Sequence, residues 1–371
     1  MKICIIYASA GAGHFKAAEA ICREFRKNNP GLDLRLIDVL TYCNPLFKYS
    51  YIYGYNFIIN HLPWLWALPF FLTSSIILKP ITSPIRFILD TLNTSGFKKL
   101  LIRENPDFVI STHFLPSQLV SDLKKDGRIR SKLFTVITDF GVHPFWVSAN
   151  TDIYIVASEL TKEQLILKKI APEKIMVLGI PIDAKFRVGF ERSVLFKRLN
   201  LEEGKFTVLI VTGSFGIGPI DEIVDSLHSQ MQLLVVCARN KGLFARLNRK
   251  KYPGVKVYGF VNNIEELMAV SDAIITKPGG LSLSETLAME LPPIFISPIP
   301  GQETENAKIM NSYGIGESAQ DPAEIKNIIS DYKTHPDKLN RVKENIGKVK
   351  KPSAAEGLYN VICQNSSGLT C

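Results

Sequence analysis

The stretch MKICIIYASAGAGHFKAAEA, residues 1–20, contains the pattern that decides the fold of this chain. An apolar run over Lys2–Tyr7 has the length of a buried strand, and a glycine turn follows it and opens into residues that favour a helix. The order strand, glycine turn, helix is typical of a parallel α/β domain. The run is shorter than the apolar core of a signal peptide, and no cleavage site follows it, so we interpret it as the first strand.

Short apolar runs alternate with helical patterns along the rest of the chain, which predicts the α/β class. The predicted strands are Lys2–Tyr7, Leu32–Ile37, Asp107–Ser111, Leu133–Thr138, Asp152–Ala157 and Lys174–Leu178 in the first half, and Phe206–Thr212, Gln232–Cys237, Val255–Tyr258, Ala273–Thr276 and Pro293–Ile296 in the second. Helices are expected between them, for example over Ala17–Lys27, Ile220–Ser229 and Leu281–Glu290.

A charged segment that contains glycine, Asp183–Lys205, has no strand pattern and is the predicted linker between two domains. A length of 371 residues also suits two domains. We expect an N-terminal domain over residues 1–185, a C-terminal domain over 186–350, and a helix and tail over 351–371 that could return to the N-terminal domain. Two open parallel sheets that face each other would form a central cleft at the carboxyl ends of their strands.

The charge balance indicates an anionic partner. The chain has a formal net charge of +9 and a pI near 9.1, so nucleic acid, acidic lipid and phosphorylated substrates are all open at this point. The six cysteines show no paired spacing, which favours reduced thiols and a cytosolic protein.

One long segment, Tyr49–Leu78, has no charged residue and is crowded with aromatic side chains. Prolines and polar residues interrupt it, so a membrane-spanning helix is not expected. Tyrosine and tryptophan favour membrane interfaces, and basic residues follow, so we predict peripheral membrane contact; the alternative is a helical hairpin in the core or a dimer contact. The predicted membrane-contacting residues are Trp64, Trp66, Phe70 and Phe71.

The first glycine turn, Gly11–His14, allows several interpretations. A dinucleotide-binding fingerprint needs a third glycine where Lys16 stands, so that interpretation fails. His14 next to free backbone N–H groups could act as a general base near pH 7. An ordinary tight turn whose histidine only caps or packs explains the local sequence equally well.

Two glycine turns in the second half follow predicted strands. Thr212–Gly218 could bring backbone amides to an anion, although a flexible connection explains it too. Thr276–Glu285 places a helix N-terminus and Lys277 where a diphosphate could bind. Ser282 and Glu285 also have the spacing of a capping box, which would explain both without a ligand.

Two further segments could recognise substrate. Pro298–Ala307 offers amide and carboxylate groups suited to sugar hydroxyls, although a solvated helix start is the simpler explanation. Thr138–Trp146 and Ser111–His113 follow first-half strands at the same end as His14, and their histidines could bind an acceptor or satisfy the core.

Five motifs in order resemble one family of enzymes. They are Gly11-Ala12-Gly13-His14, Thr138-Asp139-Phe140 with His143 and Trp146, Gly179-Ile180-Pro181-Ile182, Lys277-Pro278-Gly279-Gly280-Leu281 with Ser284-Glu285, and Pro300-Gly301-Gln302-Glu303 with Asn306. Together they are similar to the diacylglycerol glycosyltransferases, which include plant-type monogalactosyldiacylglycerol synthases and bacterial processive diacylglycerol glucosyltransferases. The lipid-linked N-acetylglucosamine transferase of peptidoglycan synthesis is a more distant relative. Ala12 stands where some relatives have a third glycine.

The resemblance implies a GT-B fold of two Rossmann-like domains and inverting transfer from a UDP-sugar. It implies that the C-terminal domain binds the donor and the N-terminal domain the lipid acceptor. The implied donor-binding residues are Gly213, Ser214, Phe260, Val261, Lys277, Gly279, Gly280, Leu281, Glu285, Gln302, Glu303 and Asn306; the acceptor-binding residues are Gly13, His113, His143 and Trp146; the candidate bases are His14 and Asp139.

The sequence therefore predicts a UDP-sugar-dependent hexosyltransferase that acts on diacylglycerol or a similar lipid. The expected partners are a UDP-sugar, a lipid acceptor and an anionic membrane surface, with no nucleic acid. The chain shows no Asp-x-Asp pair and no Cys/His cluster, so no metal or other cofactor is expected. The expected location is the inner face of the cell membrane, with the protein cytoplasmic and peripheral. The alternatives are a transferase of N-acetylglucosamine to a polyprenyl-linked sugar, a UDP-sugar epimerase, and a binding protein without activity.

Overall fold

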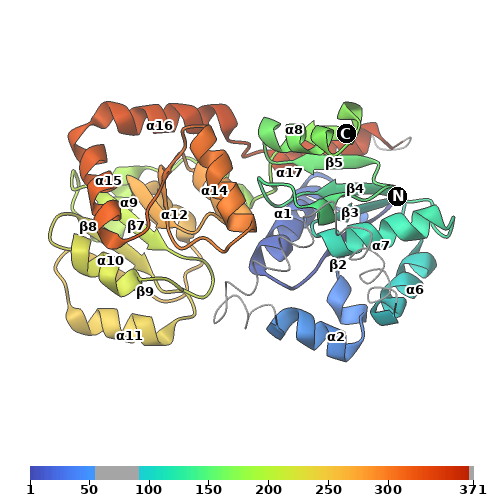
Figure 1. Cartoon of the computed structure of the whole chain (residues 1–371), viewed down its shortest axis with the longest axis horizontal. Coiled ribbons are helices and arrows are strands. Elements are labelled where there is room, and N and C mark those ends of the chain that lie inside the picture. The colour runs from blue at the N-terminus through green and yellow to red at the C-terminus, as the bar shows by residue number, and fades with distance from the viewer. Residues whose placement is uncertain (55–91, 367–371) are drawn as a thin grey trace. The chain divides into compact units, whose positions relative to one another are not determined.

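The computed structural model describes residues 1–54 and 92–366, so the four predicted membrane-contacting aromatic residues lie outside the described residues. The chain divides into two compact units. The first comprises Met1–Ala184, Ile299–Gln302 and Ser353–Cys371, and the second comprises Lys185–Pro298 and Glu303–Pro352. Each unit is a parallel sheet with helices, as Figure 1 shows.

The sheet of the first unit has six parallel strands in the order β2-β1-β3-β4-β5-β6. The strands are β1(Lys2–Tyr7), β2(Asp33–Asp38), β3(Phe108–Ser111), β4(Lys132–Val136), β5(Ile153–Val156) and β6(Ile175–Val177). The helices are α1(Ala12–Asn28), α2(Pro45–Tyr49), α6(Ser95–Glu104), α7(Phe114–Lys125), α8(Glu159–Leu167) and α17(Ala354–Gln364), with short turns η1(Val39–Tyr42), η2(Ser50–Gly54), η3(Pro144–Trp146) and η4(Pro172–Lys174).

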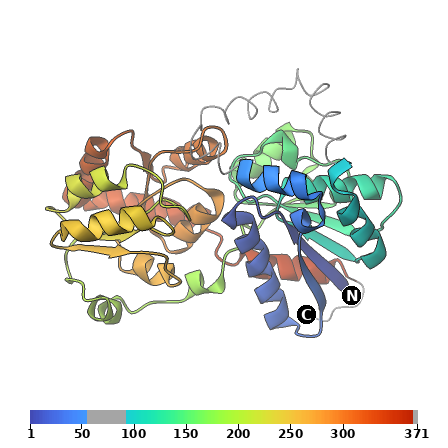
Figure 2. The same ribbon diagram turned by 90° about the horizontal axis from the view of Figure 1, so that it is seen from below.

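The alternating side chains of β1 divide the core of the first unit into two layers, because successive residues of a strand point to opposite faces. Ile3 and Ile5 pack on the face covered by α1 and α17. Cys4 and Ile6 pack on the other face against α6 and α7. Figure 2 shows α1 and α17 side by side, although they come from opposite ends of the chain. The apolar run that opens the sequence is therefore a central strand that is buried on both faces.

The sheet of the second unit also has six parallel strands, in the order β12-β11-β10-β7-β8-β9. The strands are β7(Thr207–Val211), β8(Gln232–Val236), β9(Val255–Tyr258), β10(Ala273–Thr276), β11(Pro293–Phe295) and β12(Glu317–Ser318). The helices are α9(Arg192–Arg198), α10(Ile220–Leu227), α11(Lys241–Lys250), α12(Ile264–Ala269), α13(Gly280–Ala288), α14(Gln302–Ser312), α15(Pro322–Thr334) and α16(Pro336–Val349), with the short turn η5(Ala184–Arg187) before α9.

The strand order reverses direction once in each sheet. In the first unit β2 lies on one side of β1 and β3 lies on its other side, so the direction changes between β1 and β3. In the second unit β8 lies on one side of β7 and β10 lies on its other side, so the direction changes between β7 and β10. In open α/β sheets, ligands bind outside the carboxyl ends of the strands at this switch point. The switch points therefore lie where β1 meets the Gly11–His14 turn, and where β7 meets the Thr212–Gly218 loop.

The α/β class and the parallel sheets are confirmed, and each predicted strand has a counterpart. The two-residue strand β12 was not predicted, because so short a run carries no periodicity.

The prediction of reduced thiols is wrong for Cys363, which is disulfide-bonded. Cys4, Cys22, Cys43 and Cys237 are buried and take no part in a disulfide. None of the described helices is long and apolar enough to cross a membrane.

Candidate active site

His14 lies in the first turn of α1, directly after the carboxyl end of β1. Its ring nitrogen Nδ1 lies 2.8 Å from the backbone oxygen of Thr112 and 2.9 Å from Oγ1 of Thr138. The hydroxyl of Thr112 donates in return to the backbone oxygen of His14, at 2.9 Å. Strands β1, β3 and β4 are adjacent in the sheet, so their carboxyl ends bring these three residues together.

Burial lowers the pKa of His14, while the nearby carboxylate of Asp139 and the hydrogen bond to Thr112 act in the opposite direction. The net direction is downward, so the imidazole is neutral at neutral pH. A neutral imidazole can accept a proton, and Asp139 would stabilise the imidazolium that then forms. Asp139 itself is only 3% exposed. The structure thus brings together the two residues predicted as candidate bases.

The predicted acceptor-binding histidines serve as helix caps. His113 Nδ1 accepts a hydrogen bond from the backbone of Leu115 at the start of α7, and His143 Nδ1 accepts one from Phe145 at the start of η3. The ring of His113 is 4.6 Å from that of His14, in an edge-to-face arrangement. Trp146 is 3% exposed and packs in the core with its ring 6.3 Å from that of His14. His113 and Trp146 therefore lie beside His14, and the contact of these residues, His143 and Gly13 with an acceptor stays a prediction.

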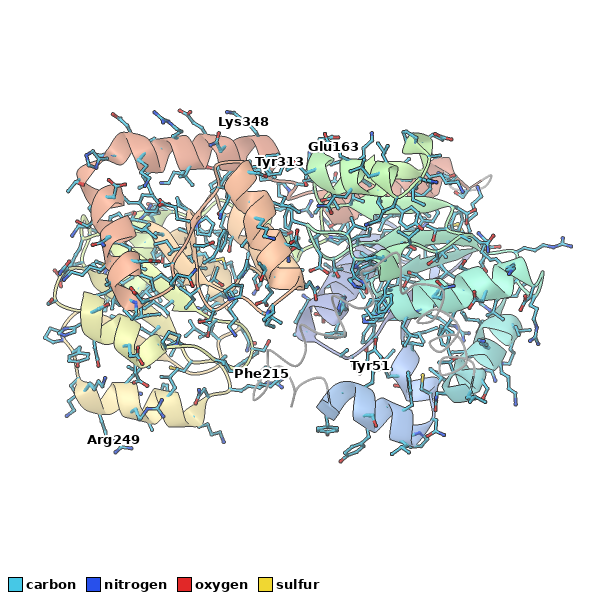
Figure 3. The ribbon with its side chains drawn as sticks, viewed as in Figure 1. Tyr51, Glu163, Phe215, Arg249, Tyr313 and Lys348 are labelled. Atoms are coloured by element: carbon cyan, nitrogen blue, oxygen red, sulfur yellow. The ribbon has the colours of Figure 1, made fainter. Side chains whose placement is uncertain are left out.

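In the loop after β7, the backbone at Gly216 lies close to the backbone at Cys237. Gly216 has a φ of +57°, and a Cβ there would lie 2.4 Å from the backbone oxygen of Cys237, so only glycine fits. Gly213 has a φ of +81°, and Phe215 is exposed on this loop, as Figure 3 shows. The hydroxyl of Thr212 is buried and has no hydrogen-bond partner among the described residues. Leaving a buried hydroxyl unpaired is costly, so a ligand that formed a hydrogen bond with Thr212 would relieve this cost.

The loop after β10 leads into α13, whose N-cap is Gly279. Ser282 is therefore inside the helix, and the capping-box explanation of Ser282 and Glu285 is wrong. Burial lowers the pKa of Lys277, and the carboxylate of Glu303 opposes this shift. A lysine that loses hydration in this way gains from a bound anion.

The remaining predicted donor-binding residues lie on other segments of the chain, and Gln302 among them belongs to the first unit. Asn306 is fully buried and its side-chain amide donates to the backbone oxygen of Pro278, at 3.0 Å, so it fixes the loop before α13. Phe260 follows β9 and is 65% exposed. Gly280 is buried at the start of α13, and the others are half-buried: Ser214, Val261, Leu281, Gln302 and Glu303.

Three threonines were missed as site residues: Thr112, Thr138 and Thr212. The signal available in the sequence was a hydroxyl directly beyond a central strand, which is a position at the switch point of a parallel sheet. Among the described residues no group of three or more His, Cys, Asp or Glu could hold a metal ion. The expectation that the reaction needs no metal stays a prediction.

The comparisons with known proteins agree with one family over the whole chain. The family model of monogalactosyldiacylglycerol (MGDG) synthase matches residues 14–182, and that of the glycosyltransferase family 28 C-terminal domain matches residues 207–358. A processive diacylglycerol beta-glucosyltransferase of Bacillus cereus is 31% identical, over 97% of this chain and 93% of its own. The chain belongs to the diacylglycerol glycosyltransferases. A relative of the same description from Bacillus cytotoxicus is 30% identical, over 100% and 95% of the two chains.

Solved structures support the fold of this diacylglycerol glycosyltransferase. MurG of Acinetobacter baumannii has a TM-score of 0.61 at 14% identity and covers 99% of this chain and 100% of its own. A UDP-GlcNAc 2-epimerase of Neisseria meningitidis has a TM-score of 0.61 at 12% identity, over 98% and 100%. Such low identities show the fold alone. The GT-B fold, with its two Rossmann-like domains, is confirmed.

Proposed function

We propose that this glycosyltransferase moves a hexose from a UDP-sugar to diacylglycerol at a membrane surface, with inversion at the anomeric carbon. The observation that carries the proposal is the match to processive diacylglycerol beta-glucosyltransferases over nearly the full length of both chains. The geometry of His14 supports it, since a partly buried imidazole whose pKa is lowered, at a switch point of the sheet, is suited to general-base catalysis.

In the proposed step, the hydroxyl oxygen of the acceptor attacks the anomeric carbon of the donor. The bond from that carbon to the diphosphate oxygen breaks, and UDP leaves with the electron pair. His14 takes the proton from the attacking hydroxyl, and Asp139 stabilises the resulting charge. One displacement inverts the anomeric configuration and needs no covalent intermediate.

The second unit would hold the donor. The N-terminus of α13 presents backbone N–H groups without a side-chain cap, and Lys277 adds a positive charge nearby. Both favour a diphosphate and would stabilise the charge that develops on UDP as it leaves. Gly213, Ser214 and the hydroxyl of Thr212 lie beyond the adjacent strand β7 and would complete the phosphate contacts.

Two features support action at a membrane surface. The net charge of +9 favours anionic lipid. The rings of Tyr49 and Tyr53, at 64% and 57% exposure, stack with centroids 4.4 Å apart on α2 and η2, and exposed tyrosine suits the interface between lipid and water. Binding to vesicles of anionic phospholipid should exceed binding to neutral vesicles and fall with added salt; equal binding to both would contradict this part of the proposal.

A screen of donors against acceptors tests the function. UDP-glucose, UDP-galactose and UDP-N-acetylglucosamine are each incubated with vesicles that contain diacylglycerol or with a polyprenyl-diphosphate-linked sugar, and the products are identified by mass spectrometry. We expect a hexosyl-diacylglycerol. A product on the polyprenyl acceptor alone, or conversion of the donor without any lipid, would overturn the proposal in favour of one of the alternatives.

A further inference from the structure

We propose that Thr138 is a positioning residue: its hydroxyl and the backbone carbonyl of Thr112 together hold the imidazole of His14 with a proton on Nδ1, which leaves Nε2 to accept the proton of the substrate. This inference rests on the proposed function, in which His14 is the base. Nothing in the family comparison assigns a role to Thr138.

The carbonyl of Thr112 determines which nitrogen of His14 carries the proton. A carbonyl oxygen can only accept a hydrogen bond, and it lies 2.8 Å from Nδ1, so Nδ1 is the donor. The position of this carbonyl is itself fixed, because the backbone N–H of Thr112 donates to Ile6 on β1, at 3.0 Å. The Thr112 hydroxyl, which donates to the backbone of His14, ties the two segments together a second time.

Thr138 supplies a second acceptor to the same N–H. Its Oγ1 lies 2.9 Å from Nδ1, and since that nitrogen already carries the proton, the bond is shared between two oxygens. Thr138 is 5% exposed, so water competes little for this bond and its electrostatic effect is strengthened. Two neutral oxygens thus take the place at Nδ1 that a carboxylate takes in a serine protease triad.

The titratable groups that face His14 come from two neighbouring elements. Asp139, beyond β4, acts through its charge and raises the pKa of His14. His113, at the start of α7, presents its ring 4.6 Å away and accepts a hydrogen bond from Leu115 on Nδ1. Neither of these interactions orients the His14 ring about its own axis. The two acceptors at Nδ1 do so.

The test replaces Thr138 with valine, which keeps the shape and removes the hydroxyl. We expect Thr138→Val to lower kcat about 2- to 10-fold, the effect of one hydrogen bond, with an unchanged KM for the UDP-sugar. The acid limb of the pH profile should move to lower pH, because the imidazolium loses an acceptor. Thr138→Ser should restore both. In the full-length protein labelled with ¹⁵N-histidine, the His14 signal, assigned by its loss in His14→Gln, should show a protonated Nδ1. In Thr138→Val the Nδ1 signal should shift, because one of the two acceptors of its N–H is lost.

Thr135→Val is the matched control. Thr135 is a fully buried hydroxyl on β4 that contacts Ser117 and Thr151 instead of His14, so its loss should lower stability without moving the pH profile or the His14 signal. A Thr138→Val enzyme with the wild-type kcat, pH profile and ¹⁵N signal would overturn the inference and leave the proposed function intact. A His14→Ala enzyme with full activity would instead remove the base on which both rest.

Discussion

In the first unit the ring of His14 is hydrogen-bonded to Thr112 and Thr138, whereas in the second unit the hydroxyl of Thr212 has no partner among the described residues. Both groups occupy corresponding places, beyond the central strands β1 and β7 of sheets with the same kind of reversal in strand order. At the first switch point the polar side chain is hydrogen-bonded within the protein, and at the second a polar side chain has no hydrogen-bond partner among the described residues.

This difference separates two tasks that the same fold performs. A base must have its tautomer and orientation set before substrate arrives, and partners within the protein achieve that. A site for a diphosphate must leave N–H, hydroxyl and ammonium groups unpaired until the ligand binds, at some cost to the stability of the empty protein. In the proposed function, the first unit would therefore supply a preorganised catalytic centre, and the second a binding site for the donor.

Removal of the base is expected to have the largest effect. His14→Ala should lower kcat about 10²- to 10⁴-fold, the usual contribution of a general base. Donor affinity should stay near the wild-type value, because the groups proposed to hold the diphosphate belong to the second unit. Product formation by mass spectrometry and titration calorimetry with UDP would measure the two effects.

His228→Ala is the control for this substitution. His228 stacks on Tyr252 in the second unit, with ring centroids 3.9 Å apart, and has no part in the proposed chemistry. It should keep full kcat. If His14→Ala lost UDP binding as strongly as it lost turnover, the assignment of separate tasks to the two units would be wrong.

Loss of the positive charge in the second unit should have the next largest effect. Lys277→Met keeps most of the side-chain length and removes the charge. A hydrogen bond to a charged group contributes about 1.5–3 kcal/mol, so the Kd for UDP should rise about 10- to 100-fold. Lys241→Met, at an exposed position on α11, is the control and should bind UDP as the wild type does. An unchanged Kd in Lys277→Met would place the diphosphate elsewhere.

Most of the fold could be predicted because the central strands are buried on both faces and therefore appear as continuous apolar runs. The runs Lys2–Tyr7, Val255–Tyr258 and Ala273–Thr276 were predicted with the bounds that the structure has. Helix starts were harder. The start of α1 was placed at Ala17, whereas the helix begins at Ala12, because a turn rich in glycine and alanine shows no apolar period.

The site could be predicted only in part, because sequence spacing does not reveal which strands are neighbours. His14 and Asp139 were chosen from local pattern and resemblance, and the structure then places the carboxylate of Asp139 close enough to act on His14. The role of Thr138 depends on a contact across 124 positions of the chain, which a single sequence cannot supply. Ser282 shows the opposite error, since its spacing to Glu285 fitted a cap that the helix does not use.

Thr212→Val tests whether the unpaired hydroxyl at the second switch point binds the ligand. It should have opposite effects on the stability of the protein without ligand and on its affinity for UDP. Without ligand, removing an unpaired buried hydroxyl should leave the protein equally stable or about 1 kcal/mol more stable. The Kd for UDP should rise about 2- to 10-fold, because one hydrogen bond to the ligand is lost. Thr138→Val should instead lower stability. Thermal unfolding with and without UDP measures both, and a Thr212→Val protein that is clearly destabilised without ligand would contradict this interpretation.

The smallest expected effect is a shift in pH dependence within the first unit. Burial lowers the pKa of His14 below its ordinary value of about 6.5, so the neutral base persists and kcat/KM should fall only when the pH drops below that value. Asp139 opposes this shift, so Asp139→Asn should move the acid limb to still lower pH, since the imidazolium loses a nearby negative charge. Profiles of kcat/KM against pH for both enzymes decide the question. An acid limb centred above 6.5, or one that Asp139→Asn moves upward, would mean that the group titrating there is not His14 in the environment described.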